Sequence, residues 1–264
     1  MVSLRIPARF YRLYLEDKPY GCSERDFHYV ERMIEIPVGE SALVLVDCWN
    51  KHYCTSYMSR SKAIIENKIV PVVEAARKAG MAIIHAPSSN VAGRYPQSKR
   101  LFEPGDEEKG PTYASVDAEW PPKEFVEREG TYSALKRVFS PPRETWKGEY
   151  ETMMIAEPVA PKPDDYVVIS GSHLHKILKK LQLLHLFYVG FATNMCLQHR
   201  DYGMRAMSER GYNPILIRDC TTAVESHETL DDLLITRMFA HEIEMKYAFS
   251  TDSPGFIEAC SRAK

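Results

Sequence analysis

Short apolar runs alternate with amphipathic stretches from residue 41 onward. Each run is rich in Val, Ile and Leu, and a loop and a stretch with helical spacing follow it. Because the runs are apolar on both faces, they are typical of parallel strands that helices cover on two sides. The pattern predicts an α/β fold with three layers, α/β/α, around a doubly wound, mainly parallel sheet of about six strands. The predicted strands are 41–47, 81–86, 166–170, 184–190, 213–218 and, more weakly, 245–250.

The predicted helices lie between these strands. Residues 61–79 have the clearest helical spacing, and Gly80 stands where a C-terminal cap is expected. The stripe that this helix would bury comprises Ile65, Ile69, Val72, Val73 and Ala76. Less regular helical spacing occurs in 173–182, 194–210 and 228–241.

Two regions do not follow the alternation. One is the first 40 residues, and the other is the long span from Pro87 to Pro163, which holds most of the prolines. A long irregular insertion in a compact domain usually forms a lid, a binding loop or an oligomer contact. We therefore predict an N-terminal extension at 1–40 and a main domain at 41–264 with an insertion at about 87–163.

Composition narrows the choice of partner. The chain has 264 residues, of which 44% are hydrophobic and 27% charged, and its formal net charge is -2. This charge supplies no broad positive field for nucleic acid or an anionic membrane, so the expected partner is a small molecule or another protein. No apolar run approaches the ~20 residues of a membrane span, and the N-terminus is too charged for a signal peptide. We therefore predict a cytoplasmic protein with no membrane contact.

The cysteines form no recognisable framework. They show no CxxC pair and no Cys/His spacing suited to zinc, so we predict free thiols and no structural metal. The six are Cys22, Cys48, Cys54, Cys196, Cys220 and Cys260.

Residues that directly follow strands are the first candidates for chemistry, because ligands of an open parallel sheet bind outside the carboxyl ends of its strands. Asp47 ends one run, and the turn GFATNMC with Cys196 ends another. Thr193 or Asn194 would cap the next helix, whose N-terminus favours a thiolate and lowers the pKa of Cys196. Asp47 would take the thiol proton. The alternatives are a cysteine that packs in the core and an aspartate that caps a turn.

Three segments then identify a family resemblance. ALVLVDCWN, EPVAPKPDDYVV and LFYVGFATNMCLQHRDYGMRAMSERGYNPILIRDCTTA resemble, in this order, the signature segments of the isochorismatase-like cysteine hydrolases, which include nicotinamidases and related amidases. The resemblance covers about residues 41–250. It implies a nucleophilic Cys196, an activating Asp47, and a turn at 191–193 that often carries a non-proline cis peptide and helps form the oxyanion hole through Ala192 and Thr193. It also implies a homo-oligomer, a dimer or a tetramer.

The resemblance also suggests a substrate pocket. Trp49, Asn50 and His52 follow Asp47 where the family lines its pocket, and Phe191 lies in the oxyanion turn; the alternative for the first three is a surface loop with a packed aromatic. His52, His85 and Asp47 would be the metal candidates, but the family's metal spacing is not present. Scattered His and Asp residues are more often satisfied polar groups, so we predict no metal and no cofactor.

One family feature is missing. The family has a third catalytic residue, a lysine that directly follows the central strand, and here Ser170-Gly171-Ser172-His173 follows that strand instead. Such a cation normally holds the charge state of the aspartate and stabilises the transition state. The candidates to replace it are Lys51, Lys147, Lys162, another lysine of the insertion, or His173.

These observations predict a cysteine-dependent hydrolase of a small-molecule C–N bond, amide or ureido, that works through a thioester. The first alternative is a family member that lost catalysis with the lysine and acts as a ligand-binding or structural protein. A third hypothesis, a flavodoxin-like or nucleotide-binding module, rests on sheet topology alone.

Overall fold

Eight strands form one sheet in the computed structural model, which describes residues 2–107, 120–138 and 140–263. Their order is β2-β1-β8-β7-β6-β3-β4-β5, and every pair from β8 to β5 is parallel. The predicted α/β class is therefore confirmed. The strands are β1 (Ser3–Arg12), β2 (His28–Pro37), β3 (Ser41–Val46), β4 (Ala82–Ala86), β5 (Tyr166–Val167), β6 (His185–Gly190), β7 (Asn213–Ile217) and β8 (Phe249–Thr251).

The six predicted strands correspond to β3 through β8. All six residues of β3 are buried, as a strand covered on both faces requires. Two predicted strands are shorter than expected. Only Tyr166 and Val167 of the run 166–170 pair with a neighbour, and β8 begins at Phe249 because Lys246 still belongs to the preceding helix.

The two additional strands come from the first 40 residues. β1 and β2 form an antiparallel hairpin, and β1 joins the edge of the sheet where Arg9 pairs with Ser250 of β8. Alternate residues of β1, Leu4, Ile6 and Ala8, are buried, so one face of the hairpin contributes to the core. The division of the chain at residue 40 stays a prediction about domain organisation.

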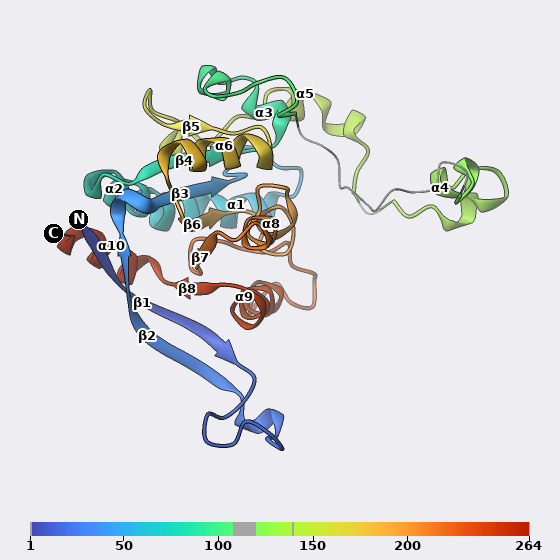
Figure 1. Cartoon of the computed structure of the whole chain (residues 1–264). Coiled ribbons are helices and arrows are strands. Elements are labelled where there is room, and N and C mark those ends of the chain that lie inside the picture. The colour runs from blue at the N-terminus through green and yellow to red at the C-terminus, as the bar shows by residue number, and fades with distance from the viewer. Residues whose placement is uncertain (1, 108–119, 139, 264) are drawn as a thin grey trace. The chain divides into compact units, whose positions relative to one another are not determined.

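Helices cover both faces of the sheet (Figure 1). Helix α10 (Ser253–Arg262) packs against α2 (Val70–Ala79) on one face, where Phe256 meets Phe187 of β6 with ring centroids 4.9 Å apart. On the other face, three helices pack against the alternate residues of β6, including Leu186 and Tyr188: α6 (Gly171–Leu181), α8 (Met204–Glu209) and α9 (Leu234–Lys246). Among the described residues, none of the helices combines the length and apolar character of a membrane span.

The helices differ in places from the predicted ranges. The helix predicted at 61–79 begins earlier, at Thr55, and passes through a π-helical segment, whereas the stretch predicted at 194–210 breaks into two short helices. The α- and π-helical segments are α1 (Thr55–Ile64), η3 (Ile65–Ile69, π), α2 (Val70–Ala79), α3 (Ser89–Ala92), α4 (Lys123–Glu127), α5 (Lys147–Glu151), α6 (Gly171–Leu181), α7 (Cys196–His199), α8 (Met204–Glu209), α9 (Leu234–Lys246) and α10 (Ser253–Arg262). The 3-10 turns are η1 (Glu24–Asp26), η2 (Val38–Glu40), η4 (Pro96–Lys99), η5 (Gly130–Leu135), η6 (Arg143–Trp146) and η7 (Glu157–Val159).

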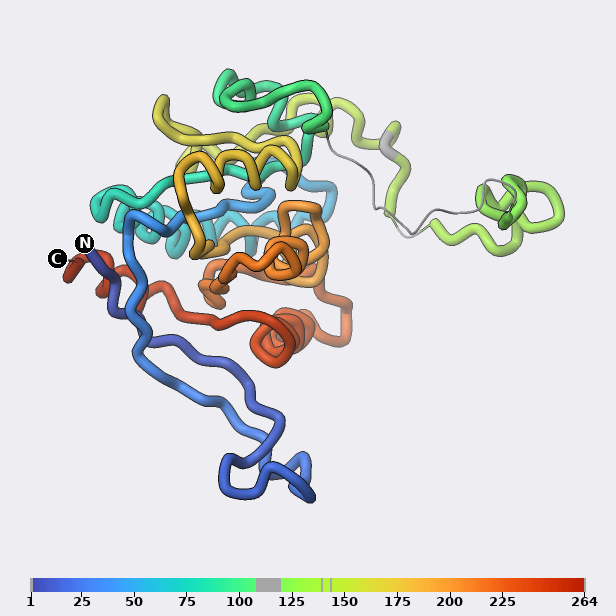
Figure 2. Tube along the Cα trace, viewed as in Figure 1, coloured from blue at the N-terminus to red at the C-terminus, as the bar shows by residue number. Residues whose placement is uncertain are grey.

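The chain divides into two compact units, one of Met1–Glu108 with Met153–Lys264 and one of Lys109–Thr152 (Figure 2). The second unit contains α4, α5, η5 and η6, and within it Phe125 contacts Tyr132 edge to face. The predicted insertion at about 87–163 extends over both units. Its residues 108–119 and 139 lie outside the described part of the chain.

Candidate active site

The candidate site lies where β3 and β6 end side by side. The chain adds β4 and β5 on one side of β3 and then β6 and β7 on the other, so β3 and β6 flank the point at which the strand order reverses. Ligands of doubly wound sheets bind at such a point. Val46 pairs with Gly190 at the ends of the two strands, so Asp47 and Phe191 follow at the same level.

Gly190 allows the two strands to approach closely. Its φ is +108°, a conformation that L side chains rarely adopt, and an added Cβ would lie 2.0 Å from the carbonyl oxygen of Val46. The next residue, Phe191, donates its backbone N–H to the same oxygen at 2.9 Å. The turn that leads to Cys196 is therefore attached directly to the strand that carries Asp47.

Asp47 presents a buried carboxylate at this edge. Its side chain is 1% exposed, its φ is +45°, and Oδ1 accepts the backbone N–H of Ser88 at 2.8 Å. Oδ2 has no hydrogen bond of ordinary geometry with the described residues, although the Trp49 indole lies near enough to act on its charge. Burial raises the pKa of Asp47 to about 6, and the Arg200 charge offsets part of this shift. The group is therefore mostly ionised at neutral pH.

Cys196 is the first residue of the one-turn helix α7. The N-cap is Met195 and has no side-chain cap bond, so the prediction that Thr193 or Asn194 caps this helix is wrong. Both residues serve other contacts. The Thr193 N–H donates to the Thr222 carbonyl at 3.1 Å, and the Asn194 side chain binds the backbone of Val224. They tie the turn to the segment after β7 rather than to the helix.

The Cys196 thiol is protonated at rest. Burial and the neighbouring Asp47 charge raise its pKa to about 12, which is the reverse of the lowering predicted from the helix N-terminus. The physical reason is that α7 has only four residues, so its dipole is small, while the thiol is largely withdrawn from water. A charged carboxylate beside a neutral thiol suits a base that takes the proton only as the sulfur attacks.

The predicted oxyanion turn contains a cis peptide bond between Phe191 and Ala192, as the family resemblance implies. The Ala192 carbonyl accepts the N–H groups of Met195 and Leu197, and Thr193 has already used its own N–H. Cys196 occupies the first helical position, where a backbone N–H has no acceptor within the helix. The role of Ala192 and Thr193 as an oxyanion turn stays a prediction.

Aromatic side chains stand next to the thiol and the carboxylate. His52 stacks parallel to Trp49 with centroids 6.4 Å apart and meets Tyr57 edge to face at 4.8 Å. Burial is the main cause of the raised pKa of Tyr57, and the charges of Cys196 and Asp47 add to it. The Tyr57 phenol therefore lies near both groups.

The two remaining predicted pocket residues differ in their surroundings. Phe191 is buried within the turn, whereas Asn50 is exposed and pairs with the backbone of Met154 through its side chain and its N–H. Tyr57 was missed by the sequence reasoning, because only the packing of α1 brings it to the site.

Structural contacts occupy the residues at 170–173, where the family resemblance leads us to expect a lysine. Ser170 caps α6 by accepting the His173 N–H at 3.1 Å, and its hydroxyl donates to the Asp106 carbonyl. The His173 ring donates to the Arg100 carbonyl (Nε2 to O, 2.7 Å), and burial lowers the pKa of this histidine. Lys176 pairs with Asp106 at 2.7 Å. His173 is therefore neutral and held by backbone groups, so it does not supply the positive charge for which it was a candidate.

Among the residues that the structure describes, Arg200 is a cation whose charge acts on both reactive groups. It lowers the pKa of Asp47 and of Cys196, so its side chain lies near the thiol. The sequence reasoning did not select it, although its spacing of four residues from Cys196 puts it one helical turn further along. Of the lysines considered, Lys147 pairs with Glu151 in the second unit, and Lys162 donates its backbone N–H to Asp165.

The structure does not assemble the metal candidates. His85 contacts Asp165 through Nε2 at 3.1 Å, rather than Asp47 or His52. Over residues 2–107, 120–138 and 140–263, the His, Cys, Asp and Glu side chains form no group of three that would hold a metal ion.

Comparison with known proteins gives a family and a fold. The family model described as the isochorismatase domain matches residues 41–245. The structure is similar to a cysteine hydrolase from Pseudomonas syringae pv. phaseolicola 1448A, with 17% identity, 86% of this chain and 94% of that chain covered, and a TM-score of 0.53. A protein of the isochorismatase family from Chromobacterium violaceum ATCC 12472 has 15% identity, 84% and 94% coverage, and a TM-score of 0.50. At such identities the likeness shows the fold alone. No curated protein matches the chain.

Proposed function

The chain belongs to the isochorismatase family, and on this premise we propose that it hydrolyses a C–N bond of a small amide or ureido compound through a thioester on Cys196. One observation carries the proposal: a buried carboxylate, Asp47, lies beside a partly buried thiol, Cys196, at the adjoining ends of β3 and β6. A buried charge costs stability, so the presence of one beside a thiol favours a functional role.

The reaction follows from the two protonation states. Asp47 takes the thiol proton while sulfur forms a bond to the substrate carbonyl carbon. The tetrahedral intermediate collapses, the C–N bond breaks, and Asp47 returns the proton to the leaving nitrogen. Water then attacks the thioester with Asp47 as base. The C–S bond breaks, the acid product leaves, and the thiolate recovers the proton.

The surroundings of the thiol support a small, partly planar substrate. Trp49, His52 and Phe191 would line the pocket. Asn50 would lie at the exposed edge of the pocket and hold the backbone of Met154 in place there. The backbone N–H of Cys196 would hold the oxyanion, and Ala192 and Thr193 would position that N–H, because the Thr193 N–H already donates to the Thr222 carbonyl.

A panel of primary amides and ureido acids, assayed for released ammonia, tests the proposal. We expect turnover that disappears in Cys196→Ala and persists in Cys22→Ala, which removes a half-buried thiol of the β1–β2 loop. Intact-mass measurement of a slowly turned over substrate should show one acyl adduct on the wild type and none on Cys196→Ala. Turnover that survives in Cys196→Ala would refute the proposal. If every compound binds without turnover or adduct, the chain is the ligand-binding family member instead.

A further inference from the structure

The site has an aspartate and a cysteine at the family's positions, but the strand that should be followed by a lysine is followed by Ser170. We propose that Arg200 supplies the missing positive charge from the other side of the nucleophile, one turn after Cys196 rather than after β5. This inference rests on the proposed function only in taking Cys196 as the nucleophile.

The backbone places Arg200 next to Cys196. The Arg200 N–H donates to the Cys196 carbonyl at 3.3 Å, which closes the single turn of α7, and the Gly203 N–H donates to the Arg200 carbonyl at 2.8 Å. The second turn is tight, because an added Cβ on Gly203 would lie 2.7 Å from the Gln198 carbonyl oxygen. The Arg200 main chain is thus held on both sides.

Three parts of the fold hold the segment that carries Arg200. The Asp201 carboxylate accepts the Gly171 N–H at 2.7 Å, at the start of the helix that follows the lysine-free strand. The Tyr202 hydroxyl donates to the Pro87 carbonyl at 3.0 Å, and the Tyr202 carbonyl accepts the Tyr188 hydroxyl at 2.8 Å. Contacts to α6, to the end of β4 and to β6 make this a positioned segment rather than a surface turn.

The side chain reaches the reacting atoms. The Arg200 guanidinium lies near enough to the Cys196 thiol to act on it, and its charge favours the ionised forms of both Cys196 and Asp47. A guanidinium stays charged throughout the accessible pH range, so it supplies a constant field where a lysine would have to resist deprotonation. Tyr57 also faces the thiol, but its raised pKa keeps it neutral.

The pH dependence of Cys196 alkylation tests this role without any substrate. Iodoacetamide labelling would be followed by peptide mass spectrometry, so that each of the cysteines is read separately. In Arg200→Met the pKa of Cys196 and the pKa of Asp47 both rise, so the profile should move to higher pH whichever group it reports, by about one unit or more. Arg200→Lys keeps the charge on a differently shaped side chain and should restore most of the shift.

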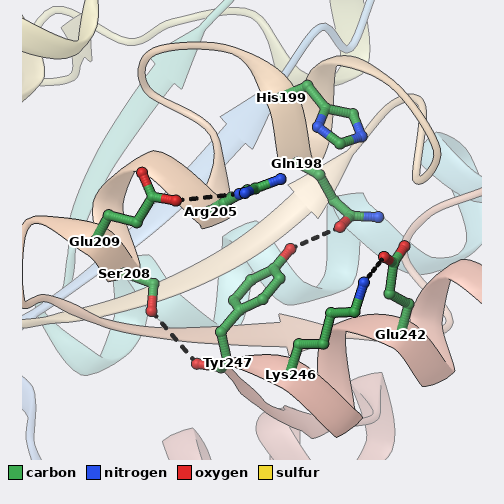
Figure 3. A pocket seen from close by; sticks show the side chains of 8 residues that line it. All are labelled: Gln198, His199, Arg205, Ser208, Glu209, Glu242, Lys246 and Tyr247. Atoms are coloured by element: carbon green, nitrogen blue, oxygen red, sulfur yellow. Dashed lines mark hydrogen bonds and ion pairs between the residues drawn. The ribbon is translucent and has the colours of Figure 1, made fainter.

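Arg205 is the matched control. It is an arginine five residues further on that pairs with Glu209 (Nε to Oε1, 3.1 Å) and lines a separate pocket of about 240 Å³ with Gln198, Lys246 and Tyr247 (Figure 3). Arg205→Met should leave the Cys196 profile where it is in the wild type. If Arg200→Met does not fold by circular dichroism, Arg200→Gln replaces it in the comparison with Arg200→Lys.

Two results would overturn the inference: an Arg200→Met profile that overlays the wild type, or an equal shift in Arg205→Met. This experiment and the amide assay can fail independently of each other. A shift with Arg200→Met in a protein that turns over no amide would leave Arg200 assigned and the hydrolase proposal refuted. Cys196-dependent turnover with no shift would do the opposite.

Discussion

Replacement of Asp47 by Asn should stabilise the fold while it abolishes turnover. The folded protein raises the pKa of this carboxyl from 3.8 to about 6, chiefly by burial. Each pKa unit corresponds to about 1.4 kcal/mol, so at neutral pH the buried charge costs about 3 kcal/mol. Asn removes the charge and keeps an amide oxygen for the Ser88 N–H, and it breaks no ordinary bond of Oδ2.

The sign of the pH dependence follows from the raised pKa. Stability that depends on a protonated Asp47 is fully present below about pH 4 and is lost as the pH rises through about 6. The wild type and Asp47→Asn should therefore be equally stable near pH 4. The variant should gain up to about 3 kcal/mol between about pH 4 and 7, and the gap should stay constant above that.

Urea unfolding followed by circular dichroism at a series of pH values measures this gap. Asp165→Asn provides a contrast of opposite sign. Burial alone would raise the pKa of Asp165, but hydrogen bonds from His85, Arg77 and the Lys162 backbone outweigh it and hold this pKa well below its ordinary value. Removal of the Asp165 charge leaves Arg77 without its carboxylate and should cost about 3 kcal/mol or more at neutral pH. An Asp47→Asn variant less stable than the wild type at pH 7, or a gap independent of pH, would refute the reasoning.

Three further predictions follow from the site and its frame. The value of kcat/KM should fall on the acid side with an apparent pKa near 6, because Asp47 must be ionised to take the thiol proton, and a limb near pH 4 would contradict this assignment. Gly190→Ala should cost about 3 kcal/mol or more in urea unfolding, since its Cβ would lie 2.0 Å from the Val46 oxygen, whereas Gly39→Ala, with open space around its Cβ, should change stability by less than about 1 kcal/mol. Turnover should persist in EDTA, and a loss that added Zn²⁺ restores would show that the reaction needs a bound metal ion in addition to the Cys196 nucleophile.

Local pattern was sufficient for the parallel part of the sheet. Strands buried on both faces need apolar residues at every position, so β3, β4, β6 and β7 were visible from composition within a few residues. The N-terminal hairpin was not predicted, because it has no run that is apolar at every position. Leu4, Ile6 and Ala8 of β1 alternate with less buried residues, as in a strand that is buried on one face. The end of α9 was misplaced because residues 245–248, Met-Lys-Tyr-Ala, suit a strand as well as a helix end.

The sequence by itself determined the residues available for chemistry: an aspartate after one buried strand, a cysteine in the turn after its neighbour, and a serine where the family resemblance leads us to expect a lysine. Only the tertiary structure decided their state. Burial raises the pKa of Asp47 and keeps Cys196 a protonated thiol, and the fold brings Arg200 near both groups. Desolvation and charge proximity depend on what packs around a group in three dimensions, and spacing along the chain does not encode them.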